Sequence, residues 1–307
     1  MITNSLESDA QALRTAMKGW GTDEAALIRF TGSRSNAQRM KIRDAYCTAF
    51  GRDLIEDLES ELTGHLQQAV VGLWRSPVEF DCAEIYLAVK GSGTNEDTLN
   101  EILGSRSNFR LTEIKKKYKE MYGEDLEERI KGETSGHYEK IMVSLLQCKR
   151  DESSNVDNSK VEKDVTDLYN AGEGKWGTDE DIFNRIFALR SPKHLFLVNN
   201  MYKSAHGKDL LEVVEGEFSG NLKVLLKSIL HAHINPADFF ADRIYLACKG
   251  WGTNDQALIR ALVTIDEAFL AEVKKIYPQK YGMTLEDQIK GETSGDYQSM
   301  LLEVIKN

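Results

Sequence analysis

The chain has 307 residues, of which 41% are hydrophobic, so it can bury a sizeable core, and its length alone suggests about two domains. Its formal net charge of -10 argues against nucleic acid as a partner and equally against direct attraction to an anionic membrane. Any contact with such a membrane would need a cation between the protein and the lipid.

Helices are expected from the start of the chain. Only four prolines interrupt it, and the segments between turn signals are rich in Leu, Glu, Lys and Ala, which favours helix over strand. The first helix is expected to begin within about seven residues of Met1, which leaves residues 1–7 as a short tail. The five helices predicted for the first repeat, this one included, lie at roughly 5–17, 22–31, 35–48, 52–59 and 63–74.

Two short strings recur four times along the chain. The first is a glycine-rich turn before a threonine, and its last glycine is Gly21, Gly93, Gly177 or Gly252. The second begins with a glutamate 40 residues later in every copy, at Glu61, Glu133, Glu217 and Glu292. Two motifs that keep one spacing through four copies indicate four structural repeats. We predict an all-α chain of five-helix repeats at residues 8–75, 76–148, 161–232 and 233–307.

Each repeat carries signals for helix starts. An apolar stripe with the spacing of one helix face follows each glutamate, as in residues 66–74. The expected N-cap residues of these helices are Thr63, Ser135, Ser219 and Ser294. The threonines that precede the second helix of each repeat are Thr22, Thr94, Thr178 and Thr253.

A polar, unpatterned stretch at residues 151–159 lengthens the spacing between the second and third repeats. We read residues 149–160 as a linker that divides the chain into two halves of two repeats each. The alternative is a short disordered insertion.

The glycine-rich turns suggest a metal site. Two glycines that flank one residue between helices can direct several carbonyl oxygens toward one point, and a carboxylate from a second loop would complete an oxygen cage suited to calcium. A phosphate-binding loop is disfavoured because acidic residues follow the threonine, and an EF-hand is excluded because its ligand series is missing. The plain alternative is that each turn ends one helix and caps the next.

These motifs resemble the calcium-site signature of the annexin family, and the resemblance covers essentially the whole chain. It implies an annexin-like array of four five-helix repeats that form a curved disc, with Ca²⁺ as cofactor. The implied first and second sites use Met17, Gly19, Gly21 and Glu61, and Val89, Gly91, Gly93 and Glu133. The third repeat departs from the pattern, and its implied ligands are Gly172, Lys175, Gly177 and Glu217. The fourth site uses Cys248, Gly250, Gly252 and Glu292, and accessory sites pair Thr22 with Glu24 and Thr94 with Glu96. At Cys248 only the carbonyl is expected to contribute.

The residues at the loop tips suggest a membrane contact. These are Trp20, Ser92, Trp176 and Trp251. Tryptophan is preferred at bilayer interfaces. The alternative is that each tryptophan folds back onto its own repeat.

The function expected from the resemblance is calcium-dependent binding to anionic, phosphatidylserine-type phospholipid membranes, without nucleic acid. A helical-repeat scaffold for protein partners is the alternative, and lateral self-assembly on membranes stays open. No nucleophile–base set recurs, so we expect no enzyme. No apolar run of about 18 residues and no secretory signal are present. The four cysteines form no CxxC pair. We therefore expect a cytoplasmic protein that is reversibly peripheral on membranes, with export by an unconventional route left open.

Overall fold

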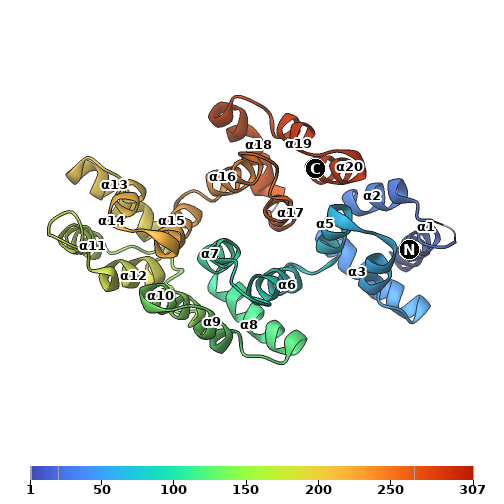
Figure 1. Cartoon of the computed structure of the whole chain (residues 1–307), viewed down its shortest axis with the longest axis horizontal. Helices are drawn as coiled ribbons and strands as arrows, with labels where there is room; N and C mark the ends of the chain where they lie inside the picture. Colours follow the sequence, from blue (N-terminus) through green and yellow to red (C-terminus); the bar gives the residue numbers. More distant parts are fainter. Residues whose placement is uncertain (1, 20, 266, 307) are drawn as a thin grey trace. The chain divides into compact units, whose positions relative to one another are not determined.

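The computed structural model describes residues 2–19, 21–265 and 267–306, and within these ranges its regular secondary structure is helical throughout (Figure 1). The all-α prediction is confirmed. No described helix combines the length and the apolar character that a membrane crossing requires.

Five helices make up each repeat. The first repeat contains α1 (Ile2–Ala16), α2 (Glu24–Gly32), α3 (Asn36–Phe50), α4 (Leu54–Glu61) and α5 (Gly64–Trp74). The second contains α6 (Pro77–Val89), α7 (Glu96–Ser105), α8 (Asn108–Tyr122), α9 (Leu126–Glu133) and α10 (Gly136–Leu146). The third contains α11 (Asn158–Ala171), α12 (Glu180–Leu189), α13 (Pro192–His206), α14 (Leu210–Glu217) and α15 (Gly220–Ile234). The fourth contains α16 (Pro236–Cys248), α17 (Asp255–Thr264), α18 (Glu267–Tyr281), α19 (Leu285–Glu292) and α20 (Gly295–Val304).

Helix ends differ from the predicted ones by a few residues, for local reasons. Helix α1 begins at Ile2, so most of the expected tail 1–7 is helical. Helix α3 runs on to Phe50 because Gly51, in the left-handed conformation, ends it. Helix α11 begins inside the predicted linker, at Asn158, because Asp157 accepts a hydrogen bond from the Ser159 amide.

The predicted caps are only partly correct. Thr63, Ser135, Ser219 and Ser294 occupy the N-cap positions of α5, α10, α15 and α20, but none of their side chains makes a capping hydrogen bond. In three of the repeats the second helix is capped by the residue after the threonine: the side chains of Asp23, Asn95 and Asn254 accept hydrogen bonds from amides three residues later at 2.9, 3.1 and 3.1 Å, whereas Asp179 in the third repeat makes no such bond. The threonines are thereby free for another role.

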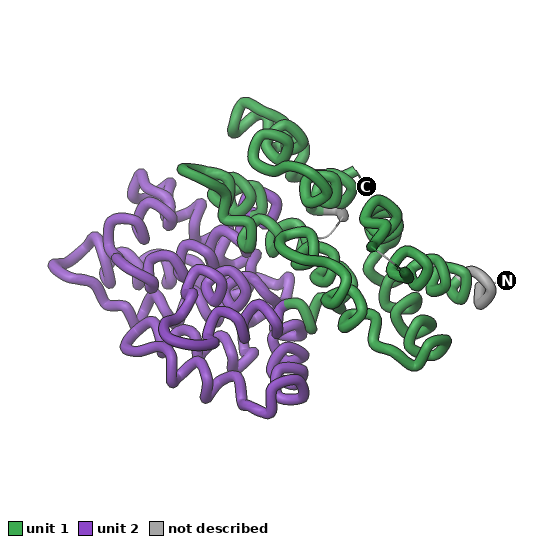
Figure 2. The backbone as a smooth tube through the Cα atoms, turned by 45° about the vertical axis from the view of Figure 1, so that its right-hand side comes forward, with its two compact units in different colours: residues 1–80, 240–307 green, residues 81–239 purple. Residues whose placement is uncertain are grey.

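The chain forms two compact units, and one of them combines the beginning and the end of the chain. One unit comprises residues 1–80 and 240–307, and the other comprises residues 81–239 (Figure 2). The first therefore joins the first and fourth repeats, and the second joins the second and third. Our prediction that the linker separates two successive halves is wrong.

Small residues let helices of different repeats approach closely inside each unit. A Cβ atom at Gly104 of α7 would lie 3.3 Å from Leu225 Cδ1 of α15, in the unit of residues 81–239. In the other unit, a Cβ atom at Gly32 of α2 would lie 2.3 Å from Glu303 Cγ of α20, closer than packed atoms approach. A larger side chain at either position would push the paired helices apart.

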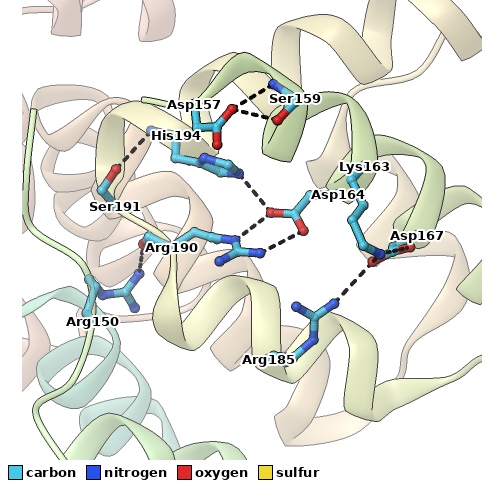
Figure 3. A network of polar contacts seen from close by, with 10 residues as sticks. All are labelled: Arg150, Asp157, Ser159, Lys163, Asp164, Asp167, Arg185, Arg190, Ser191 and His194. Atoms are coloured by element: carbon cyan, nitrogen blue, oxygen red, sulfur yellow. Dashed lines mark hydrogen bonds and ion pairs between the residues drawn. The ribbon is translucent and has the colours of Figure 1, made fainter. Parts of the chain in front are cut away.

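The start of the linker is hydrogen-bonded to both the second and the third repeat, within the unit of residues 81–239. The Asp151 amide donates to the Leu189 carbonyl at 2.8 Å, and Arg150 Nη1 donates to the Arg190 carbonyl at 3.0 Å (Figure 3). The Asn108 side chain holds the Arg150 carbonyl at 2.7 Å. These bonds argue against a disordered insertion.

An ion pair ties the first helix to the end of the second in three of the repeats. Arg34 Nη2 lies 3.1 Å from Asp9, Arg106 Nη2 lies 2.9 Å from Asp81, and Arg190 Nη2 lies 3.0 Å from Asp164. His194 also contacts Asp164, at 2.8 Å (Figure 3). Burial alone would raise the pKa of Asp164, but hydrogen bonds and charge from Arg190 and His194 lower it. The fourth repeat carries Phe240 and Ile265 at the equivalent positions. In the first three repeats, the ion pair therefore fixes the first two helices, whose connection forms the glycine-rich loop, to each other.

Candidate metal sites

The glycine-rich loops connect the first and second helices of each repeat, and one backbone hydrogen bond closes each loop at its base. The amide of Asp23 donates to the Ala16 carbonyl at 2.9 Å. The equivalent bonds join Asn95 to Ala88 at 2.8 Å, Asp179 to Ala171 at 2.7 Å and Asn254 to Ala247 at 2.7 Å. All four loops therefore have the same closed base.

Two glycines in the left-handed region shape the first, second and fourth loops. Their φ angles are 119° and 88° at Gly19 and Gly21, and the same arrangement recurs at Gly91 and Gly93 and at Gly250 and Gly252. A Cβ atom at any of these glycines would meet nothing within 4 Å, so the loops are open on this side. Such backbone is strained for other residues, which explains why both positions are glycine.

Each loop is joined to its predicted carboxylate by the threonine that follows it. Thr22 Oγ1 donates to Glu61 Oε2 at 2.7 Å. The same bond joins Thr94 to Glu133 at 2.7 Å, Thr178 to Glu217 at 2.6 Å and Thr253 to Glu292 at 2.9 Å. The structure thus places each glutamate beside the loop whose last glycine precedes it by 40 residues. The 39-residue spacing from threonine to glutamate is visible in the sequence, but from the sequence we assign these threonines to helix starts and, for Thr22 and Thr94, to accessory sites, and we do not predict this bond.

Buried side chains anchor the first residue of three loops. Met17, Val89 and Cys248 are 3%, 1% and 4% exposed, so they fix the backbone from which the first predicted carbonyl ligand arises. Burial, followed by the nearby Glu292 and Asp255 carboxylates, raises the pKa of the Cys248 thiol to about 12. The thiol stays protonated and is a poor metal ligand, in agreement with a role for its carbonyl alone.

The third loop has a different conformation. Only Gly177 has a positive φ angle there, and Gly172 ends α11 with φ -125° and ψ -105°. The Gly172 carbonyl already accepts a hydrogen bond from the Lys175 amide at 3.0 Å. A Cβ atom at Gly172 would lie 3.3 Å from Glu217 Cδ, so the predicted ligands are close together. This loop must give up an internal hydrogen bond if all its carbonyls are to face one ion.

The accessory sites predicted at Thr22 with Glu24 and at Thr94 with Glu96 have fewer candidate ligands than the main sites. Glu24 and Glu96 are the first residues of α2 and α7, directly beside the loops. The hydroxyls of Thr22 and Thr94 donate to the main carboxylates, so an accessory site would use the threonine carbonyls.

The tips of the described loops point into solvent. Trp176 and Trp251 are fully exposed, and Ser92 is exposed as well. Trp20 lies outside the described residues. Trp74, the fourth tryptophan, is buried, and its Nε1 donates to Thr31 Oγ1 at 2.9 Å. Trp176 and Trp251 therefore do not fold back onto their repeats.

The donor set fits a hard divalent cation. Backbone carbonyls, one carboxylate and a neighbouring hydroxyl are all oxygen donors, which Ca²⁺ prefers. The open side of each loop leaves room for oxygens that do not come from the chain. Each loop therefore has the chemistry to hold a cation and to present it outward.

Comparison with known families agrees with this arrangement. The Annexin family model matches residues 8–73, 80–145, 163–229 and 239–304, each within one of the four predicted repeats. Annexin A11 of Oryctolagus cuniculus is 45% identical over 296 residues, 96% of this chain and 59% of that protein. Human annexin A5 is 43% identical over 295 residues, 96% of this chain and 92% of that protein. The chain thus spans about three fifths of the length of annexin A11 and most of annexin A5.

Solved structures show the same fold. The structure of annexin III superposes with a TM-score of 0.93 at 38% identity, covering 98% of this chain and 94% of that chain. Calcium-bound annexin (Sm)1 superposes with a TM-score of 0.87 at 30% identity, covering 98% of this chain and 90% of that chain.

Proposed function

The chain belongs to the annexin family, and from this premise we propose that it binds anionic phospholipid membranes in a calcium-dependent manner. The observation that carries the proposal is the fourfold threonine–glutamate bond, which places one carboxylate beside each glycine-rich loop. A loop that only turned the chain would not need a carboxylate delivered from a distant helix end. The scaffold alternative leaves this repeated contact unexplained.

The residues have distinct parts in the proposed mechanism. The carbonyls of Met17, Gly19 and Gly21 and the Glu61 carboxylate would hold the ion in the first loop, and Thr22 orients the carboxylate by its hydrogen bond. The second and fourth loops repeat this set. When bound, Ca²⁺ supplies the positive charge that the acidic protein surface lacks, so headgroup oxygens can complete its coordination.

The same proposal covers the lipid class and the location. A phosphatidylserine-type headgroup offers phosphate and carboxylate oxygens, both of which suit the remaining coordination positions. We place the protein in the cytoplasm, because its four cysteines are unpaired, and on membranes only as a peripheral protein. Lateral self-assembly would add further loops to one membrane contact. The proposal assigns no catalytic step to this chain.

Sedimentation with vesicles tests the proposed function. We expect the protein to pellet with phosphatidylserine-containing vesicles in calcium and to return to the supernatant when a chelator is added. Vesicles of phosphatidylcholine alone are the control for headgroup charge. Equal pelleting in calcium and in chelator would contradict the mechanism, and no pelleting in either would favour the scaffold alternative.

Replacing either exposed loop-tip tryptophan alone, Trp176→Ala or Trp251→Ala, should weaken vesicle binding about tenfold, since burying an aromatic side chain contributes roughly 1.5 kcal/mol or more. In the unsubstituted protein, tryptophan emission should shift to the blue when vesicles and calcium are both present. Phe109→Ala is a matched control, because Phe109 is an exposed aromatic residue away from the loops. Unchanged affinity and an unchanged spectrum would show that the tips do not enter the interface.

A further inference from the structure

The second loop differs from the others at one position in the helix that carries its glutamate. The residue four positions before the glutamate is Asp57, Arg129, Val213 and Gln288 in the four repeats. Residues four apart lie on the same face of a helix, so a long polar side chain at this position can reach the carboxylate. Only the second repeat has a cation there.

The Arg129 guanidinium contacts two of the predicted calcium ligands at once. Its Nη2 donates a hydrogen bond to the Val89 carbonyl and forms an ion pair with Glu133 Oε1 at 3.0 Å. The other carboxylate oxygen of Glu133 accepts the Thr94 hydroxyl. A single nitrogen of Arg129 therefore lies between the first carbonyl of the second loop and its only carboxylate.

The other repeats lack this charge. In the fourth repeat, the uncharged Gln288 Nε2 donates to Glu292 Oε1 at 3.5 Å. In the third, Val213 is apolar and 2% exposed. In the first, Asp57 is bound to Arg52 and Tyr46, away from Glu61.

Resting on the calcium sites proposed above, we propose that Arg129 is a tethered cation that competes with calcium for the second loop. In the calcium-free protein Arg129 neutralises the Glu133 carboxylate and donates a hydrogen bond to the Val89 carbonyl. These two contacts must be broken before the Val89 carbonyl oxygen and Glu133 Oε1 can face one ion. Arg129 Nε is buried without a hydrogen-bond partner among the described residues, so the side chain is only partly held in place. The second loop should therefore fill at higher calcium concentration than the first and fourth.

The test isolates the second loop in the full-length protein. The parent carries Glu61→Gln, Glu217→Gln and Glu292→Gln, and its affinity for calcium chloride is measured by calorimetry without lipid. Adding Arg129→Gln, which places there the residue that the fourth repeat has, should raise calcium affinity about fivefold, the factor expected for an ion pair of this exposure. In chelator, the same substitution should lower the unfolding temperature, because Glu133 loses its counter-charge.

Two further variants separate competition from a general charge effect. Lys131→Gln removes the same charge from the same helix, where Lys131 pairs with Glu127 and Glu128, and should leave calcium affinity unchanged within twofold. Gln288→Arg, in a parent that retains only Glu292, should lower the affinity of the fourth loop by a similar factor.

The outcomes distinguish this inference from the proposed function. Unchanged or weaker calcium binding on Arg129→Gln would overturn the inference alone and would mean that Arg129 holds Glu133 in position for the ion. The parent with Glu61→Gln, Glu217→Gln and Glu292→Gln retains only Glu133. If this parent bound no calcium, either with Arg129 or with Arg129→Gln, both the second site and this inference would be overturned.

Discussion

Replacing Glu61, Glu133 and Glu292 together with glutamine should abolish calcium-dependent vesicle binding while leaving the helical content unchanged. Each glutamate supplies the only full charge among the proposed ligands of its site, and glutamine keeps a side chain of the same size that can still hydrogen-bond to the threonine hydroxyl. Without the carboxylate, neutral carbonyls alone face a doubly charged ion, and affinity falls with each charged ligand lost. Vesicle sedimentation over a calcium series and circular dichroism measure the two effects.

A matched control removes the same charge from the same three helices. Glu56, Glu128 and Glu286 lie in α4, α9 and α19 but make no contact with the loop threonines. Their triple replacement with glutamine should leave vesicle binding nearly unchanged. If calcium-dependent binding survives the loss of Glu61, Glu133 and Glu292, Glu217→Gln is added to remove the carboxylate of the third loop as well. Binding that persists in this quadruple variant would refute the assigned sites.

Vesicles containing phosphatidylserine should increase the apparent calcium affinity by at least about tenfold, a shift of 1.4 kcal/mol or more. Each loop neutralises only half the charge of Ca²⁺, so binding in solution should be weak, with dissociation constants on the order of 10⁻⁴–10⁻³ M. Headgroup oxygens can complete the coordination and cancel the remaining charge. By linkage, calcium must raise lipid affinity by the same factor.

Several loops that engage one surface add avidity, so binding should be steep in calcium concentration. Calorimetric titrations with and without vesicles measure the shift, and phosphatidylcholine vesicles are the control for headgroup charge. If calcium affinity were equal in both conditions, the ion would be structural, and the lipid would have to be bound by other groups.

Much of the site could be predicted because its signals are local or strictly periodic. The left-handed glycines at Gly19 and Gly21 are required by the backbone of a short loop, whatever surrounds it. The spacing to Glu61 repeats in every copy, which made the pairing of loop and carboxylate visible. The orientation of Glu61 by Thr22 was missed, since a threonine before a helix is equally well explained as a cap.

The third loop and Arg129 show where local reasoning fails. The departure of the third loop from the pattern is visible in the sequence, but the hydrogen bond from the Lys175 amide to the Gly172 carbonyl depends on how that loop closes. From the sequence, Arg129 reads as a solvated helix residue, and only its position between Val89 and Glu133 supports the proposed competition for the second loop.

The sequence by itself determined the helices, their four-repeat order and the composition of each loop, because these follow from side-chain periodicity, caps and glycine positions within one repeat. Only the tertiary structure decided which repeats pack together. The apolar faces of all four repeats look alike, so the pattern does not specify partners, and the linker suggested successive halves. The close approach at Gly104 and Gly32 instead joins the second repeat with the third and the first with the fourth. Packing of this kind depends on shape complementarity between surfaces distant in the chain, which no local signal encodes.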